Sequence, residues 1–343
     1  MAAPAIEADG LVKRFGELEA VKNVSFEVPE GRVLGVLGPN GAGKTTIIRI
    51  LTTILTATAG RATVLGIDVA HDPQGVRERI GLAGQYAAVD ENLTGRENLR
   101  MVGQLTHLPK AYVRTRTDEL LEQFNLTHAA DRPVKTYSGG MRRRLDLGAA
   151  LVHKPPVLFL DEPTTGLDPQ SRNDLWGVIQ GLVDDGTTVL LTTQYLEEAD
   201  RLADNIAVID NGHKIAEGTA SELKATLGAT IVEVVFADLE AAQQARTIAA
   251  PVGASEIDSD GRTLKVNVND GGASVLQLVR LLDAASAQPE SIAVREPTLD
   301  DVFLSLTGHV AEADKDAIDA ESETAEPSGR SRRSDRDAKK GAA

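Results

Sequence analysis

The sequence contains no cysteine, and aromatic residues make up only 3% of its 343 residues. The absence of cysteine excludes disulfide bonds, thiolate zinc sites and cysteine nucleophiles, and it favours a reducing, intracellular compartment. No stretch reaches the roughly 18 consecutive apolar residues of a membrane-spanning helix, and the N-terminus lacks the basic start and apolar run of a secretory signal. We therefore expect a chain that is soluble by itself.

Basic charge is also scarce, because 36 Lys and Arg stand against 51 Asp and Glu, for a formal net charge of −15. This balance argues against a general affinity for nucleic acid phosphates, so we expect no nucleic acid partner. The six histidines are scattered, without the i, i+4 pair and intervening glutamate of zinc hydrolases. A histidine metal site is therefore not expected.

Short apolar runs alternate with helical periodicity through the first two thirds of the chain. The runs "GRVLGVLG", "PPVLFLDEP", "TTVLLTTQ" and "NIAVIDNGHKIAEG" read as strands, the last with a turn at Asn211 and Gly212. "KTTIIRILTTIL" reads as a helix that directly follows the first of them. This alternation predicts an α/β fold in which helices cover a parallel sheet.

Two segments depart from the alternation. Strand signals are absent between Leu93 and Val134, where Thr94 and Glu97 form a capping box before a helical pattern, so a helical insertion is expected. After about Lys224 the order becomes βαββαβ, which predicts a small ferredoxin-like α+β domain that ends in a docking helix, "PTLDDVFLSLTG". We expect domains at 1–222 (helical subdomain about 87–137) and 223–309, followed by a disordered charged tail at 310–343.

A glycine-rich loop lies between the first strand and its helix. "GPNGAGKT", Gly38 to Thr45, has the spacing G-x-x-x-x-G-K-[ST], in which backbone N–H groups and the helix N-terminus hold phosphate. Lys44 would reach the terminal phosphates, and Thr45 would hold Mg²⁺. The strand before and the helix after are the context that this P-loop motif requires.

An acidic pair ends a second buried strand, in "VLFLDE". Asp161 would complete the metal site, and the neighbouring Glu162 would orient and polarise an attacking water. An apolar strand that ends in Asp-Glu is common, so the pair carries weight only together with the phosphate loop.

A second candidate anion site is "YSGGMRRRLDLGAALV". Ser138 reads as a helix N-cap, yet Arg142, Arg143 and Arg144 crowd the first turns, where cations oppose the helix dipole. An anion bound at Ser138 to Gly140 would offset this conflict. One chain would then carry two phosphate-binding helix starts.

The motifs "GPNGAGKTT", "YSGGM" and "LFLDEPTTGLDP", in this order and spacing, resemble the nucleotide-binding subunit of ATP-binding cassette (ABC) transporters over residues 5–220. The resemblance implies an ATP- and Mg²⁺-dependent ATPase that works as a head-to-tail homodimer, with the Ser138 loop of one copy on ATP bound by the other. It also implies a separate multi-span membrane permease and a peripheral place on the cytoplasmic side of the membrane.

Further roles follow from the same resemblance. Phe15 would stack on adenine, although a lone phenylalanine also suits a core. Gln85 would sense Mg²⁺ and couple to the permease, and Asp168 would contact the opposite copy. The nucleotide-binding set that the resemblance implies comprises Phe15, Gly38, Pro39, Asn40, Gly41, Ala42, Gly43, Lys44, Thr45, Thr46, Ser138, Gly139, Gly140 and Asp168. The catalytic set comprises Glu162, Gln194 and Gln85, and the metal set comprises Thr45, Gln85 and Asp161.

One position departs from the family pattern, because "LLTTQYLEEAD" has Gln194 where a histidine is usual. Glutamine can hydrogen-bond a terminal phosphate but carries neither proton nor charge at neutral pH. Either hydrolysis is slow, or Glu162 suffices with Gln194 as a positioning group. This glutamine, "GQYAAVDENLTGRENL" and "EPTLDDVFLSLTG" together are similar to the daunorubicin-resistance-type drug-exporter ATPases.

Three functions remain open. The first is the ATP-hydrolysing subunit of an exporter that powers efflux of a drug or other hydrophobic small molecule. The second is a soluble ABC-type ATPase that is not coupled to transport, and the third is a non-catalytic, nucleotide-gated module. Co-purification with a membrane protein separates the first from the second, and phosphate release separates the third from both.

Overall fold

A six-stranded sheet forms the centre of the computed structural model, which describes residues 3–84, 89–227, 230–258, 260–268 and 271–307. The strand order is β10-β9-β3-β8-β7-β6, parallel throughout except for the β9-β10 hairpin. The strands are β3 (Val33–Leu37), β6 (Ile80–Ala83), β7 (Val157–Asp161), β8 (Thr188–Thr193), β9 (Asn205–Asp210) and β10 (His213–Gly218). The predicted parallel sheet is thus confirmed.

Both faces of this sheet are buried, which explains why its strands read as unbroken apolar runs. Along β7, Val157 and Phe159 join one core cluster while Leu158 and Leu160 join another on the opposite face. The first cluster includes the helix α1 (Lys44–Leu51). The second includes α5 (Gly139–Ala150) and α6 (Pro169–Asp184), and α7 (Leu196–Leu202) follows β8. Helix α1 ends at Leu51, a turn earlier than the sequence pattern suggests, because Thr53 takes φ 63°.

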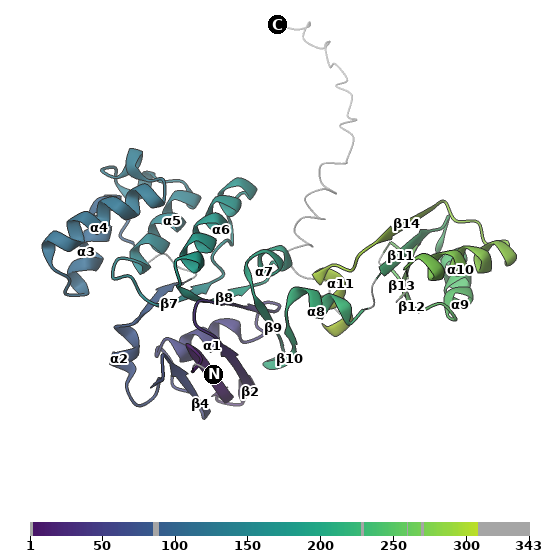
Figure 1. Ribbon diagram of the computed structural model, residues 1–343, viewed down its shortest axis with the longest axis horizontal. Helices are drawn as coiled ribbons and strands as arrows, with labels where there is room; N and C mark the ends of the chain where they lie inside the picture. The colour runs from purple at the N-terminus through teal and green to yellow at the C-terminus, as the bar shows by residue number, and fades with distance from the viewer. Residues whose placement is uncertain (1–2, 85–88, 228–229, 259, 269–270, 308–343) are drawn as a thin grey trace, which may run out of the picture.

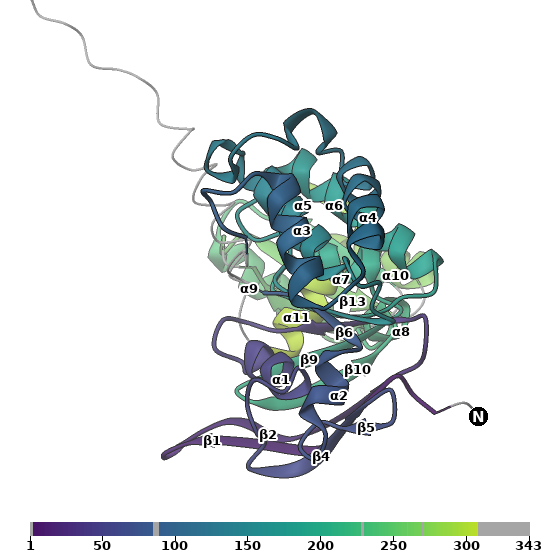
Figure 2. The same cartoon turned by 90° about the vertical axis from the view of Figure 1, so that its left-hand side faces the viewer.

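A four-stranded antiparallel sheet was not anticipated from the sequence. Its order is β2-β1-β4-β5, from β1 (Ile6–Phe15), β2 (Leu18–Val28), β4 (Ala59–Val64) and β5 (Ile67–Asp68), and α2 (Pro73–Arg77) follows it. The pairing of β1 with β2 shifts register between Ala8 and Leu11, between Leu11 and Lys13, and between Lys13 and Arg14. Each shift breaks the two-residue alternation by which strands are recognised. Figure 2 shows this sheet below α1.

The helical insertion is present as α3 (Gly95–Leu105) and α4 (Lys110–Gln123), followed by the short helices η1 (Thr127–Ala129) and η2 (Val134–Thr136). The capping box is confirmed, because Glu97 N–H donates to Thr94 Oγ1 at 3.1 Å and Thr94 N–H to Glu97 Oε2 at 2.8 Å. Figure 2 shows α3, α4 and α5 standing together at the end of the molecule opposite β1 and β4.

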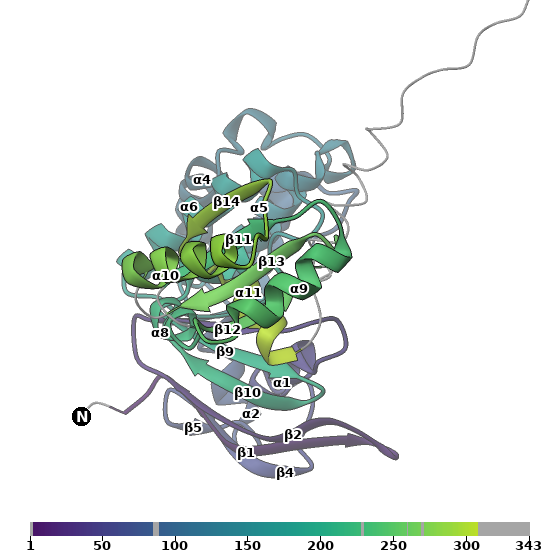
Figure 3. The same cartoon turned by 90° about the vertical axis from the view of Figure 1, so that its right-hand side faces the viewer.

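The βαββαβ unit is also confirmed, with strand order β12-β13-β11-β14 as in a ferredoxin-like sheet. It consists of β11 (Thr230–Val235), α9 (Leu239–Ala249), β12 (Ala254–Ile257), β13 (Thr263–Val268), α10 (Gly271–Ala284) and β14 (Ser291–Arg295), and α8 (Ala220–Ala225) precedes it. Both α9 and α10 lie on the face of this sheet that points away from the rest of the molecule (Figures 1 and 3).

The predicted docking helix, α11 (Leu299–Thr307), returns to the N-terminal part of the chain. Its Leu299, Val302 and Phe303 are buried in one cluster with residues of α7, α8 and β9. Arg295 at the end of β14 binds Asp301 of α11 at 2.9 Å and Glu233 of β11 at 2.8 Å, and so ties the helix to the small sheet. The predicted tail, 310–343, lies outside the described residues.

Candidate nucleotide site

The glycine-rich loop joins the carboxyl end of β3 to the start of α1, as predicted. Two of its glycines are required by close backbone approach: a Cβ on Gly38 would lie 2.1 Å from Ile209 O, and one on Gly43 would lie 2.5 Å from Ala20 O. Gly43 also has φ 109°, a conformation that side-chain-bearing residues rarely adopt. The first N–H groups of α1 have no intrahelical partners, so the loop offers donors to an anion.

The other predicted loop residues follow the same path. Asn40 and Gly41 are exposed, Ala42 is buried, and Pro39 and Thr46 are half-buried. The loop therefore has an open rim above a buried floor.

Lys44, the first residue of α1, turns back over the loop. Its Nζ donates to Gly38 O at 2.7 Å and to Pro39 O at 3.0 Å, and lies 3.4 Å from Glu162 Oε1. The side chain is only 3% exposed. A cation is thus held at the mouth of the loop by carbonyl groups, where phosphate charge would arrive.

Asp161 and Glu162 lie beside the loop, at the carboxyl end of β7. Thr45 Oγ1 donates to Asp161 Oδ1 at 3.1 Å, and Thr192 Oγ1 of β8 donates to the same oxygen at 2.6 Å. Glu162 has φ 49°, which is uncommon for a residue other than glycine, and its N–H donates to Thr192 O at 3.1 Å. Backbone strain of this kind persists where surrounding contacts enforce it, and it is frequent at functional sites.

The Thr45 hydroxyl and the Asp161 carboxylate suit Mg²⁺ by their chemistry. Both are hard oxygen ligands, and their separation of 3.1 Å allows one ion to bind both. No group of three or more His, Cys, Asp or Glu side chains that could hold a metal occurs within the described ranges. A site of this composition fits Mg²⁺ that completes its shell with phosphate oxygens and water rather than a cage of protein ligands.

Gln194 directly follows β8, two residues beyond Thr192. Its side-chain oxygen Oε1 is buried and finds no hydrogen-bond partner among the described residues. This oxygen can only accept, so it could receive a hydrogen bond from a bound water, whereas a phosphate oxygen would need the Nε2 amide group of the same side chain as its donor.

A buried carboxyl group is provided by Glu198 of α7, four residues after Gln194 in the chain. Glu198 is fully buried, and Trp176 of α6 donates its indole N–H to Glu198 Oε1 at 3.0 Å. Burial raises the pKa of Glu198, and hydrogen bonds to its carboxyl group oppose this shift. Sequence reasoning missed this contact, because Glu198 reads as one more polar position of a surface helix.

The second predicted anion site, at the start of α5, lies beside the Asp168 turn rather than beside the phosphate loop of the same chain. Ser138 caps α5 by accepting from Met141 N–H at 3.2 Å, as predicted, and Ser138 and Gly139 are exposed. A Cβ on Gly140 would lie 2.6 Å from Ser171 Oγ, and Ser171 Oγ donates to Asp168 at 2.7 Å. This hydrogen bond lowers the pKa of the exposed Asp168.

The three arginines of α5, expected to oppose the helix dipole, each find partners within the protein. Arg142 pairs with Glu91 at 3.0 Å, and Arg144 donates to Phe124 O at 3.4 Å. Arg143 is largely buried and lies 3.4 Å from Asp146. The arginines therefore give no independent sign of a bound anion, and anion binding at Ser138 to Gly140 stays a prediction.

Phe15, at the end of β1, is 45% exposed and hence not a core residue. Lys13 Nζ lies 5.2 Å from its ring centroid, in cation–π range. An exposed ring is compatible with stacking on adenine, which stays a prediction. Gln85 lies outside the described residues, so its two predicted roles also stay predictions.

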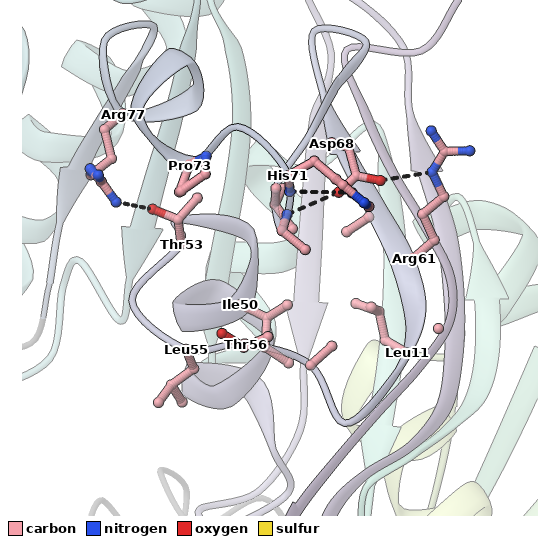
Figure 4. A pocket seen from close by; sticks show the side chains of 15 residues that line it. Leu11, Ile50, Thr53, Leu55, Thr56, Arg61, Asp68, His71, Pro73 and Arg77 are labelled. Carbon is pink, nitrogen blue, oxygen red and sulfur yellow. Dashed lines mark hydrogen bonds and ion pairs between the residues drawn. The ribbon is translucent and has the colours of Figure 1, made fainter.

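A cavity of about 700 Å³ lies between the end of α1, β4 and α2, and none of its lining residues belongs to the predicted site (Figure 4). Its polar side chains bind one another: Asp68 bonds Arg61 at 3.1 Å and His71 at 3.0 Å, and Arg77 donates to Thr53 at 3.0 Å. The hydrogen bond from His71 lowers the pKa of Asp68 to about 2. The charged side chains that line the cavity are thus paired with one another or with Thr53.

Comparison with known proteins agrees with this geometry. The ABC transporter family matches residues 21–165, and the family "ATP-binding protein DrrA1-3-like, C-terminal domain" matches residues 218–307. The daunorubicin resistance ATP-binding protein DrrA2 of Streptomyces coeruleorubidus is 52% identical over 90% of this chain and 96% of its own length. The daunorubicin/doxorubicin resistance ATP-binding protein DrrA of Streptomyces peucetius is 50% identical over 90% and 94%. The crystal structure of the ADP conformation of MJ1267, an ATP-binding cassette of an ABC transporter, superposes with a TM-score of 0.59 at 28% identity, over 64% of this chain and 93% of that one.

Proposed function

This chain belongs to the ABC transporter family of ATP-binding proteins, in the branch of the daunorubicin resistance proteins, and from this premise we propose that it is the ATP-hydrolysing subunit of a drug exporter. The observation that carries the proposal is the meeting of Lys44, Thr45, Asp161 and Glu162 at the carboxyl ends of β3 and β7. Binding alone would need the loop and Lys44. A carboxylate held next to the metal-binding residue adds a candidate general base.

Each residue then has a distinct task. Lys44 and the N–H groups of the loop bind the terminal phosphates and stabilise their charge. Glu162 orients the attacking water and accepts its proton. Mg²⁺ held by Thr45 and Asp161 would neutralise charge on the transferred group. Gln194 donates a hydrogen bond to the terminal phosphate without changing its own charge.

A second copy of the chain is part of the proposal. Ser138, Gly139 and Asp168 are exposed, as surfaces that cover nucleotide bound by another copy must be before the two meet. Nucleotide at the interface of two head-to-tail copies would bring these groups to the phosphates. The resulting homodimer would hold ATP between its subunits.

The membrane pathway would come from another protein. No helix in the described part of the chain is long and apolar enough to cross a bilayer. We propose a separately encoded, multi-span permease, with this subunit bound peripherally at the cytoplasmic face. The names of the relatives, which concern daunorubicin and doxorubicin resistance, favour a hydrophobic drug as cargo.

The proposed ATPase activity is tested by measuring the phosphate that the purified chain releases from ATP in the presence of Mg²⁺. Glu162→Gln should abolish steady-state release while nucleotide binding persists, and it should trap an ATP-dependent dimer in size-exclusion chromatography. Glu240→Gln makes the same charge change at an exposed position of α9 and should behave like the wild type. A monomer with nucleotide demonstrably bound would count against the two-copy arrangement.

Transport needs a cellular assay. Cells that express the chain together with its membrane permease should accumulate less daunorubicin than cells with the same permease and the Glu162→Gln variant. Equal accumulation, with both proteins present in the membrane fraction, would refute drug export while leaving the ATPase assignment intact.

A further inference from the structure

Arg143 lies on the second turn of α5, and its side chain points into the protein rather than toward solvent. The side chain is 11% exposed. Its Nε donates to Pro163 O at 2.6 Å, and Nη2 donates to Asp161 O and Glu162 O, both at 3.2 Å. Its Nη1 donates to Gly84 O, from the end of β6. One guanidinium therefore joins α5 to two other segments of the chain.

The charge of this guanidinium is balanced inside the protein. Burial lowers the pKa of Arg143, while the carboxylate of Asp146 and more distant acids oppose that shift. Asp146, one turn further along α5, is 2% exposed and lies 3.4 Å from Nη1. Arginine remains protonated at neutral pH even so, and its planar fork can serve several carbonyl groups at once. An ammonium group, as a compact point charge, cannot reach both segments together.

The segments that Arg143 joins are those that the proposed mechanism uses. Asp161 and Glu162 carry the proposed metal-binding and base side chains, and Arg143 donates to their backbone carbonyl groups rather than to their carboxylates. Gly84 directly precedes Gln85. The helix that carries Arg143 is capped by Ser138, which belongs to the loop proposed to cover nucleotide on a second copy.

We propose that Arg143 is a positioning residue that fixes the 161–163 turn and the end of β6 to the start of α5. Through these contacts it sets the position of Asp161 and Glu162 relative to the Ser138 loop, which the same copy presents to its partner. The proposal rests on the proposed function. It deepens that function by naming what keeps the two half-sites of one chain together.

A matched control is available on α4. Arg116 is also 11% exposed, pairs with Glu119 three residues later at 3.0 Å, and donates to the backbone oxygen of Leu151 at 3.2 Å. Its burial and types of partner are those of Arg143, but its contacts reach the far end of α5. Arg116→Gln therefore reports what the loss of a buried arginine does to this region in general.

The test compares Arg143→Gln, Arg143→Lys and Arg116→Gln with the wild type in phosphate release over a range of ATP and Mg²⁺ concentrations, alongside melting temperature. We expect Arg143→Gln to lower kcat at least ten-fold, with the KM for ATP changed less than about three-fold. The Mg²⁺ concentration for half-maximal rate should rise, because the Asp161 backbone is no longer fixed. Arg143→Lys should keep the charge but not recover the rate, and Arg116→Gln should keep kcat within two-fold.

Several outcomes overturn the inference. If folded Arg143→Gln has a kcat within two-fold of the wild type, Arg143 has no positioning role. The same conclusion follows if kcat falls equally in Arg143→Gln and Arg116→Gln and the fall parallels the fall in melting temperature. If Arg143→Gln does not fold, the rate of Arg143→Lys tests the proposal instead. A wild-type rate in that variant would refute the requirement for a planar guanidinium that bonds both segments. A wild type that releases no phosphate refutes the proposed function itself, and this inference with it.

Discussion

Gln194 gives the most discriminating prediction, because its structural and catalytic effects should have opposite signs. Its Oε1 is buried and lacks a hydrogen-bond partner among the described residues. Such a group costs about 1–3 kcal/mol when no nucleotide is bound. Gln194→Ala removes this cost and loses some side-chain packing, so we expect an unfolding free energy that is unchanged or higher.

The catalytic rate should fall in the same variant. If Gln194 donates to charge that develops on the terminal phosphate, loss of that hydrogen bond should reduce kcat about ten-fold, equivalent to roughly 1.4 kcal/mol. Affinity for ATP should change less, since the loop and Lys44 remain. Gln194→His should stay active and should gain a dependence of rate on pH between about 6 and 7, where imidazole titrates.

Two measurements on the same preparations decide the matter. The first is phosphate release at saturating Mg²⁺ and ATP, with the permease present and across that pH range, which gives kcat. The second is urea unfolding, followed by the fluorescence of Trp176, the single tryptophan of the chain, which gives the free energy of unfolding. Gln180→Ala, at an exposed position of α6, is the control and should alter neither quantity. Equal kcat for glutamine and alanine would remove Gln194 from the mechanism. A loss of stability above about 2 kcal/mol would instead assign it a packing role.

Three further predictions concern other parts of the chain. Lys44→Ala should weaken ATP binding at least ten-fold in titrations with a fluorescent nucleotide, because it removes the buried cation of the loop; unchanged affinity would contradict its assignment. Truncation after Gly308 should leave ATPase activity and melting temperature near the full-length values, because residues 310–343 contain almost no large apolar side chains; a large drop in either would mean that this segment docks. Glu198→Gln keeps an acceptor for Trp176 and removes a carboxyl whose pKa burial raises above 4.5. The stabilising contribution of Glu198 is present below pH 4.5 and is lost as pH rises through the folded-state pKa, so the variant should gain stability relative to the wild type as pH rises above 4.5 in urea unfolding; identical pH profiles would contradict the raised pKa.

Local signals explain which parts of the fold the sequence predicted. The phosphate loop, the capping box at Thr94 and the turn at Asn211 and Gly212 depend on residues close together in the chain. Asn211 has φ 48° and Gly212 has φ 83°, as the hairpin between β9 and β10 requires. Within the small βαββαβ unit, β13 keeps the two-residue alternation by which strands are recognised, with Leu264, Val266 and Val268 buried.

The parts that sequence reasoning missed depend on distant pairing. Register shifts hide β1 from a search for alternation, although Ile6, Ala8 and Leu11 are buried. The pair of Trp176 and Glu198 spans 22 residues, and each residue alone looks ordinary. Nothing in "MRRRL" indicates which arginine turns inward, since that depends on where the 161–163 turn and Gly84 lie in space.

The three arginines of α5 bear on how one helix would serve the two nucleotide sites that we propose. Successive residues on a helix point in directions about 100° apart, so Arg142, Arg143 and Arg144 must face different surroundings. Arg142 meets Glu91 at the surface, Arg144 meets the end of α4, and Arg143 enters the centre of the chain. A rigid helix that has an exposed start at Ser138 and an inward arginine bonded to the 161–163 turn cannot shift at one end without displacing the other. Closure of a second copy onto Ser138 would then shift Glu162, because Arg143 bonds the backbone carbonyl groups of the 161–163 turn. Loss of the Arg143 contacts should uncouple the two ends even if both nucleotide-binding surfaces remain intact.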